Sequence, residues 1–258
     1  VELAQATPQL SSLVTALVKY PDLVDLLSNN GTFTVFAPNN DAFAALLGAI
    51  GQTSIDDIPE DVLKSVLQHH VFASAALEAS AVTSGTITMA GGETVEVVAD
   101  ANGVFLDNAQ VIAVDVLGSN GVVHIINSVL VPPSMLPIVG TIVAPAYFNK
   151  DFTTLIAAVL SADTDILGLL LGNGPSDGGL TLFAPTNAAF EAAGVTDVNG
   201  ADAVLAYHVI DGTIMASMLP TTNGVSSEVP TLGGNIYLTN AGSGVFINGT
   251  TEVVATDI

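Results

Sequence analysis

The chain has 258 residues, 50% of them hydrophobic, and contains no cysteine. This length suits two domains of about 130 residues, each large enough to fill its own core. The lack of cysteine excludes disulfides, thiol chemistry and thiolate metal sites. Three basic residues, all lysine, against 25 acidic residues give a formal net charge of −22, which disfavours nucleic acids and anionic membranes as partners.

Neither membrane insertion nor a leader peptide is indicated. The longest uncharged apolar-rich stretch, residues 135–148, is short and is interrupted by proline and glycine. No basic-then-apolar segment stands at either end, which favours a mature or trimmed chain. The acidic excess has two interpretations: solubility in a salty medium, where ions screen the repulsion, or a cation-dependent adhesive surface. We take solubility as the simpler expectation.

The first part of the chain has helical spacing of its apolar residues. Leu13 and Leu17 share one face of a first helix. A second short helix follows Pro21 and ends near residues 29–31, and a third starts at the acidic turn of residues 56–61. The first part of the chain is therefore predicted to be mainly helical.

Between these helices, residues 32–43 predict a strand, a stop and a helix start. β-Branched and aromatic residues favour a strand at Phe33–Phe36, and Pro38 is expected to end it. Three polar residues can cap the helix that follows: Asn39, Asn40 or Asp41. We predict that one of them accepts a hydrogen bond from a backbone N–H two or three residues on.

From residue 86 the apolar period changes from about 3.6 to two, which is typical of strands. Residues 90–93 (Ala-Gly-Gly-Glu) indicate a hairpin turn. The expected strands are residues 87–89, 95–97, 104–106, 111–114 and 122–130. Residues 132–134 (Pro-Pro-Ser) cannot continue a ladder and form the natural linker.

Segments of this first half return about 140 residues later. Residues 181–190 repeat the strand, stop and helix start, with Thr186 or Asn187 as the cap, and residues 245–247 repeat 104–106. A period this long indicates tandem globular domains rather than a solenoid. We predict two domains, residues 1–134 and 135–258. The strands expected in the second are residues 229–232, 236–238, 245–247 and 253–255.

These phrases carry a resemblance to a known family. The segment Thr-Val-Phe-Ala-Pro at 34–38, the Tyr207–His208 pair and the closing phrase at 120–133 resemble the conserved segments of fasciclin (FAS1) domains. The resemblance covers essentially the whole chain in two copies. It implies an α+β fold of two FAS1-like domains, each a β-sandwich or wedge of short strands with a helical layer built from its N-terminal half. It also implies a secreted or cell-surface location and no enzymatic activity.

The four histidines are the first candidates for catalysis or metal binding. His69 and His70 are adjacent, so on a helix they point about 100° apart and cannot easily share a metal. We expect His70, His124 and His208 to be structural, with His70 and His208 buried and hydrogen-bonded inside their own domains. His69 stands where the family usually has tyrosine.

No catalytic or cofactor-binding residue is indicated. The chain lacks a nucleophile elbow, a Walker loop and a Rossmann glycine run, and it lacks the EF-hand spacing. Oxygen-rich segments at 56–61, 163–165 and 173–177 leave weak calcium binding open, although helix caps and solvated loops explain them equally.

Two functional hypotheses remain. In the first, the chain is an adhesion module that binds other extracellular proteins, cell-surface receptors or polysaccharide. In the second, it is a passive spacer or matrix component of a larger surface protein, with no ligand of its own. In animal FAS1 proteins a Tyr-His pair and an Asp-Ile pair are linked to receptor binding. By resemblance, these map onto Tyr207 and His208, His69 and His70, Asp257 and Ile258, and, with valine for isoleucine, Asp115 and Val116.

The second copy lacks the closing phrase. Domain one continues past Asp115 into the predicted strand 122–130, whereas Asp257 is followed by Ile258 alone. An omitted strand would leave backbone groups unpaired and an apolar groove uncovered. We therefore expect either that the natural chain continues or that another chain donates a strand to domain two, and we favour continuation.

Overall fold

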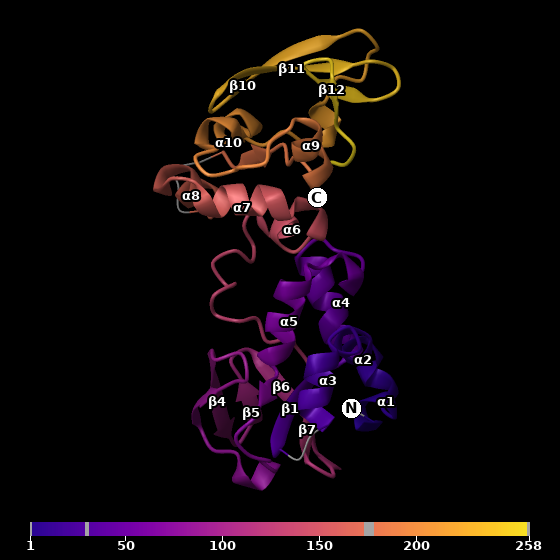
Figure 1. Ribbon diagram of the computed structural model, residues 1–258, viewed down its shortest axis with the longest axis vertical. Coiled ribbons are helices and arrows are strands. Elements are labelled where there is room, and N and C mark those ends of the chain that lie inside the picture. Colours follow the sequence, from indigo (N-terminus) through magenta and orange to yellow (C-terminus); the bar gives the residue numbers. More distant parts are fainter. Residues whose placement is uncertain (1, 29–30, 173–177, 257–258) are drawn as a thin grey trace. The chain divides into compact units, whose positions relative to one another are not determined.

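The computed structural model describes residues 2–28, 31–172 and 178–256 (Figure 1). The chain divides into two compact units, Val1–Val139 and Gly140–Ile258, which we call domain one and domain two. The division falls five residues after the expected boundary between residues 134 and 135. Each unit begins with helices and continues into strands, which confirms the predicted α+β class.

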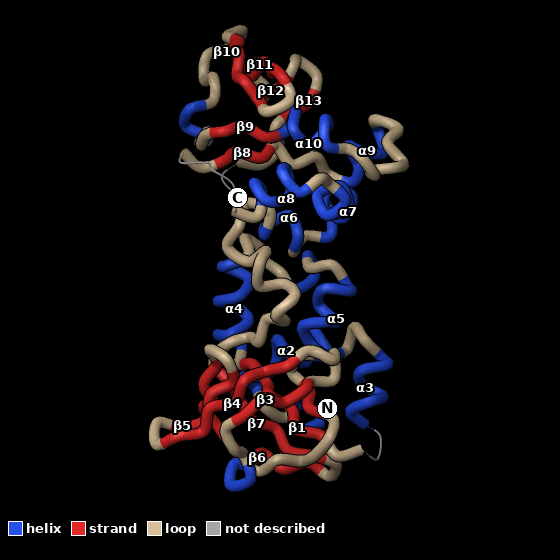
Figure 2. Tube along the Cα trace, turned by 90° about the vertical axis from the view of Figure 1, so that its left-hand side faces the viewer, coloured by secondary structure: helices blue, strands red, loops and turns tan. Residues whose placement is uncertain are grey.

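Domain one opens with short helices that bury one face each. Leucines recur at helical spacing in them, and Leu13, Leu23 and Leu67 are all less than 5% exposed. Figure 2 shows α4 and α5 beside each other, to one side of the strands of this domain. The helices are α1 (Glu2–Gln5), α2 (Ser11–Leu17), α3 (Pro21–Ser28), α4 (Asn40–Ala49) and α5 (Glu60–Gln68).

A seven-stranded sheet completes domain one, in the order β2-β1-β7-β6-β5-β4-β3. The strands are β1 (Phe33–Pro38), β2 (Val71–Phe72), β3 (Gly85–Thr88), β4 (Thr94–Asp100), β5 (Gly103–Leu106), β6 (Ala109–Gly118) and β7 (Gly121–Ile126). The β1–β7 pair is parallel, with Phe33 opposite Gly121, and every other pair is antiparallel. Register shifts in β6 between Val111 and Val116 bend the sheet at this strand, which joins β2, β1 and β7 on one side to β5, β4 and β3 on the other.

The strand at Phe33 is longer than predicted. It continues through Pro38, which lies opposite Ile126 in β7. β1 ends at Pro38 as predicted, but it includes Ala37 and Pro38 beyond the expected Phe33–Phe36, because proline lacks a donor only on the β2 side. Phe36 donates its N–H to the carbonyl of His70 on that side, but β2 does not extend far enough to face Pro38. The missing N–H therefore breaks no ladder bond.

Two other expectations for domain one have mixed outcomes. The hairpin around residues 90–93 is confirmed, since β3 and β4 pair with Thr88 opposite Thr94. The last strand is shorter than the predicted 122–130, because β7 ends at Ile126. Val129 and Leu130 lie beyond it and are still buried.

Domain two repeats the helical layer but divides its strands into two sheets. The helices are α6 (Ala144–Tyr147), α7 (Thr153–Ser161), α8 (Thr164–Leu170), α9 (Asn187–Ala192) and α10 (Asp202–His208). The strands are β8 (Leu180–Leu182), β9 (Val209–Asp211), β10 (Ser226–Thr231), β11 (Gly234–Asn240), β12 (Val245–Ile247) and β13 (Thr251–Glu252). β8 pairs with β9, and β10 to β13 form a separate sheet in that order. The strand expected at residues 253–255 is instead Thr251–Glu252.

Hydrogen bonds confirm that the two domains are copies. The Thr34 hydroxyl donates to the carbonyl of Ala75 at 2.8 Å, and the Thr181 hydroxyl donates to that of Gly212 at the same distance. The predicted caps form in both copies. The Asn39 side chain accepts the N–H of Ala42 at 2.8 Å, and the Thr186 hydroxyl accepts that of Ala189 at 3.3 Å.

The copies differ in how deeply the repeated strand is buried. In domain one Phe36 is 1% exposed and Ala37 is fully buried. The matching residues of domain two, Phe183 and Ala184, are half-buried and exposed. β1 has a strand on each side, whereas among the described residues β8 pairs with β9 alone.

Candidate functional site

His70 follows the last turn of α5 and is held on both sides of its ring. Nδ1 donates to the carbonyl of Val66 at 2.7 Å, and Nε2 accepts the backbone N–H of Leu130 at 2.8 Å. The ring is 2% exposed, and this burial lowers its pKa to about 4. The imidazole is therefore neutral at pH 7 and ties the helix to the segment after β7. The expectation of a buried structural histidine is confirmed here.

His208 departs from that expectation. Its Nδ1 makes the same local bond, donating to the carbonyl of Val204 at 2.7 Å, but the side chain is only half-buried. The prediction that it is buried was wrong. In domain one Leu130 covers and engages the outer ring nitrogen, and no described residue of domain two takes that place.

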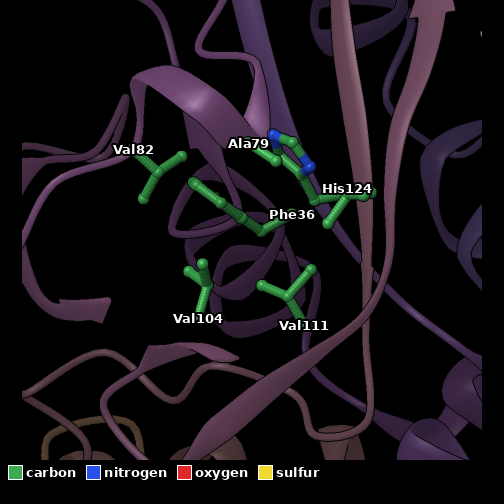
Figure 3. Close-up of a pocket in the computed structure, with 7 residues that line it drawn as sticks. Phe36, Ala79, Val82, Val104, Val111 and His124 are labelled. Atoms are coloured by element: carbon green, nitrogen blue, oxygen red, sulfur yellow. The ribbon is translucent and has the colours of Figure 1, made fainter. Parts of the chain in front are cut away.

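His124 is also structural. It lies on β7 and is 1% exposed; its Nε2 donates to the carbonyl of Leu77 at 2.7 Å. The ring stacks on Phe36, with centroids 5.7 Å apart (Figure 3). The Asp115 N–H points to its Nδ1 at 3.4 Å, so the histidine also fixes the bend of β6.

The Asp115–Val116 pair, a candidate adhesion position, is part of the framework of domain one. Asp115 adopts a left-handed conformation with φ of 56°, and its carboxylate accepts the N–H of Ala79 at 2.7 Å. Val116 is half-buried and pairs with Val123 of β7. The corresponding pair in domain two, Asp257 and Ile258, lies outside the described residues.

Tyr207, the other candidate in domain two, is fully hydrogen-bonded. Its hydroxyl donates to the carbonyl of Asn235 at 2.9 Å and accepts from the side-chain amide of Asn248 at 3.1 Å. The ring meets His208 edge-on, with centroids 6.4 Å apart. The residue thus connects α10 to the start of β11 and to the turn that follows β12.

His69, the counterpart of Tyr207, is 1% exposed, so it is not available to a partner at the surface. Neither ring nitrogen has a hydrogen-bond partner among the described residues. Desolvation lowers the pKa of its imidazole, while Glu93 and Asp107 act in the opposite direction. Sequence reasoning missed these two carboxylates. Aligning the repeats would have revealed them, because they replace Asn235 and Asn248.

Two concave regions of domain one are too small for a typical ligand. The hollow in Figure 3 is lined by apolar side chains and His124 and has no room for a water-sized guest. A second cavity, of about 70 Å³, lies among Leu3, Leu17, Phe33 and neighbouring apolar residues. Sites for drug-sized ligands are usually about 300–1,000 Å³. Neither region therefore suggests a carrier of small molecules.

The most exposed apolar strip on a strand of domain one lies on β6. β5 pairs only with Ala109 and Gln110 of this strand, so from Val111 to Gly118 β6 has β7 as its strand partner. Along this part, three side chains are exposed: Ile112 (48%), Val114 (48%) and Leu117 (62%). We call Ile112–Leu117 the β6 strip. Asp115 and Val116 lie within it.

The described residues contain no group of three His, Asp or Glu side chains placed to hold a metal ion. Of the oxygen-rich segments, Asp163 caps α8 by accepting the N–H groups of Asp165 and Ile166. Asp56 pairs with Lys19, and residues 173–177 lie outside the described part. None of the described helices is long and apolar enough to cross a membrane.

Known proteins that are similar to this chain each match about half of it. Protein sll1483 from Synechocystis sp. is 41% identical over 133 residues, which is 52% of this chain and 73% of that protein. Cell surface glycolipoprotein MPB83 from Mycobacterium bovis is 36% identical over 137 residues, 51% of this chain and 59% of that protein.

Among solved structures, a FAS1 domain pair from the insect cell adhesion molecule fasciclin I aligns with 90% of this chain and 83% of its own, at 17% identity and a TM-score of 0.36. The family model described as the fasciclin domain matches residues 8–132 and again residues 150–258. The chain therefore belongs to the fasciclin domain family and carries one copy in each half.

Proposed function

We propose that this chain is an extracellular, non-catalytic adhesion module, and that the β6 strip of domain one contacts its partner. Membership of the fasciclin family in both halves supports the class of function. The name of the relative MPB83 places that protein at a cell surface, and we extend this location, secreted or surface-held, to the present chain.

The exposure of the β6 strip is the observation that carries the proposal. Ile112, Val114 and Leu117 leave apolar surface in water beside a strand edge. Exposed apolar side chains along a strand suit binding by an apolar patch or by strand addition. The framework bonds of Asp115 hold the strip in one shape, which lowers the entropic cost of binding.

The charge of the chain restricts the partner. At a net charge of −22, an acidic partner would be repelled at low ionic strength. We therefore propose a neutral polysaccharide or a protein with a neutral or basic surface. Weak calcium binding could join acidic loops to such a partner, so calcium is a variable in the test.

The test is a glycan-array and cell-binding assay of the 258-residue chain, with and without millimolar calcium. Leu117→Ser and Ile112→Ser should weaken saturable binding about tenfold each, because they remove apolar contact area from the β6 strip. Val18→Ser is the matched control, since Val18 is 55% exposed but lies away from β6. Binding that all three variants retain would overturn the role of the strip.

The passive spacer is the second candidate. It is favoured by the internal bonds of His70, His124 and Asp115, which account for the family's conserved positions without any ligand. If the chain binds no glycan, cell or extracellular protein saturably in either calcium condition, the spacer is correct.

A further inference from the structure

The side-chain cluster around Tyr207 in domain two differs from its counterpart in domain one at three matching positions. Tyr207 of domain two interacts with Asn235 and Asn248, and all three are uncharged. In domain one the matching residues are His69, Glu93 and Asp107, and all three are ionisable. The cluster of domain two is thus uncharged and hydrogen-bonded throughout. In the cluster of domain one, the buried imidazole of His69 has no hydrogen-bond partner among the described residues.

The backbone at this place is the same in both domains. Asp107 and Asn248 have φ of 48° and 52°. The Oδ1 of Asp107 accepts the N–H of Glu96 at 3.0 Å, and the Oδ1 of Asn248 accepts that of Tyr237 at 2.9 Å. The second atom of each side chain therefore points the same way. In Asn248 that atom is the amide nitrogen that donates to Tyr207, so in Asp107 it is a carboxylate oxygen directed toward His69.

Glu93, in the turn before β4, is the second carboxylate near the His69 ring. It also contacts Ser134. Its two carboxylate oxygens accept the hydroxyl and the N–H of Ser134, at 2.7 and 3.0 Å. Ser134 follows Pro133, where the chain leads out of the sheet of domain one. The hydrogen bonds from Ser134 lower the pKa of Glu93, and the nearby His69 adds to this.

We propose that His69 is a proton-operated switch of the Glu93–Ser134 contact. When the buried imidazole takes up a proton from solvent, it becomes a cation between two carboxylates, Glu93 and Asp107. Each carboxylate then accepts a charge-assisted hydrogen bond from a ring N–H that had no partner before. The Glu93 carboxylate turns toward the ring, and its hydrogen bonds to Ser134 are lost.

The charged groups around His69 come from three elements. Glu93 and Asp107 favour its protonated form, and Glu93 is the stronger of the two. The adjacent His70 interacts with His69 unfavourably when both are charged, but His70 is neutral until about pH 4. Burial lowers the pKa of His69 below its usual 6.5, and the hydrogen bonds from Ser134 lower the pKa of Glu93 below its usual 4.5.

The experiment is an NMR titration of the whole chain between pH 7.5 and 4.5. It follows the His69 ring signals together with the chemical shift and the exchange protection factor of the Ser134 amide. We expect the protection factor to fall about tenfold or more, as for the loss of a hydrogen bond to a charged group. Its midpoint should lie below pH 6.5 and coincide with that of the His69 ring.

Two variants identify the group responsible. His69→Tyr introduces the residue that domain two uses, and the Ser134 amide should then stay protected down to pH 4.5. Glu93→Gln keeps one acceptor oxygen for the Ser134 N–H without the charge that attracts the imidazolium, and it should make the protection independent of pH. The proposal is overturned if Ser134 stays protected while the His69 ring titrates, or if the wild type and His69→Tyr lose protection at the same pH.

Discussion

The two domains share their repeated segments, caps and threonine bonds, yet among the described residues only domain one has a continuous sheet. In domain one, β7 lies between β1 and β6 and joins the two groups of strands. In domain two, β8 and β9 are separate from the sheet of β10 to β13. The parallel strand β7 thus decides whether the repeated segments form a fully buried core, as in domain one, or a partly exposed one, as in domain two.

The histidine pair shows the same dependence on β7. His70 and His208 make the same bond to the carbonyl four residues earlier. Only His70 also receives the N–H of Leu130, from the segment after β7, and only His70 is buried. Local sequence therefore sets the rotamer of the ring, while a distant segment sets its burial.

The largest expected difference between the domains concerns the phenylalanine of the repeated strand. Phe36→Ala should lower the free energy of unfolding of domain one by about 3–5 kcal/mol, because it leaves a cavity under the sheet. Phe183→Ala should cost domain two about half as much, since Phe183 is already partly in water. Urea unfolding followed by residue-specific hydrogen exchange measures each domain separately. Equal losses of unfolding free energy in the two domains would show that β7 does not increase the burial of this phenylalanine.

Acid should affect domain one through His70. Its pKa is about 4 in the folded state and near 6.5 when unfolded, so the unfolded state binds more protons between these values. The stabilisation is complete above pH 6.5 and is lost as the pH falls toward 4, by about 3 kcal/mol at 1.4 kcal/mol per pH unit. The measurement is the urea midpoint of domain one at pH 7, 5.5 and 4.5.

The matched control for this pH effect is His70→Gln. It keeps a polar side chain but removes the titration, so its stability should change less over the same range of pH. Identical pH profiles for the wild type and the variant would assign the acid sensitivity to other groups.

We propose that β8 accepts an extended segment in the parallel register that β7 takes on β1. A synthetic peptide with the sequence of residues 121–130 has no acidic residue to oppose the charge of the chain. At a hundredfold excess over its Kd, it should stabilise domain two by about 2.7 kcal/mol. Domain one should not respond, because its own β7 holds the site.

A peptide with proline at the position of His124 is the control for this experiment, because it removes a backbone donor that faces β1 in the register of β7. Thermal unfolding of domain two with each peptide decides the result. If neither peptide raises the melting temperature, strand donation to β8 is wrong.

The smallest expected effect concerns the helix caps. Asn39→Ala and Thr186→Ala should each cost about 1 kcal/mol, and Asn39 slightly more, because its bond is shorter at 2.8 Å against 3.3 Å. Asp41→Ala, in the first turn of α4 but not its cap, is the control. A loss from Asp41→Ala as large as that from Asn39→Ala would mean that charge near the helix end matters more than capping.

Features that depend on nearby residues could be predicted from the sequence. The caps, the hairpin at residues 90–93, the bond from His70 to Val66 and the duplication follow from short segments whose bonds are local or repeated. The family's fold and its α+β class followed from the two signature phrases.

Features that depend on distant strands could not be predicted in this way. The extension of β1 through Pro38 requires knowing that β2 ends early on one side and that β7 continues on the other. The exposure of His208 depends on a segment that the described part of domain two does not supply. The cluster of His69, Glu93 and Asp107 spans 38 residues of sequence, and only a comparison of the two copies identifies it.

The parallel pairing of β1 with β7 also has a consequence for synthesis. Phe33 lies opposite Gly121, 88 residues later, so this pair joins the first strand of domain one to its last. During translation β1 leaves the ribosome long before its partner exists, with one edge uncovered and its aromatic side chains in water. Contacts this distant in sequence slow folding and leave strand edges open to other chains. Domain one should therefore reach its closed form only after residue 126 has emerged, when the α-helices of domain two are already being made.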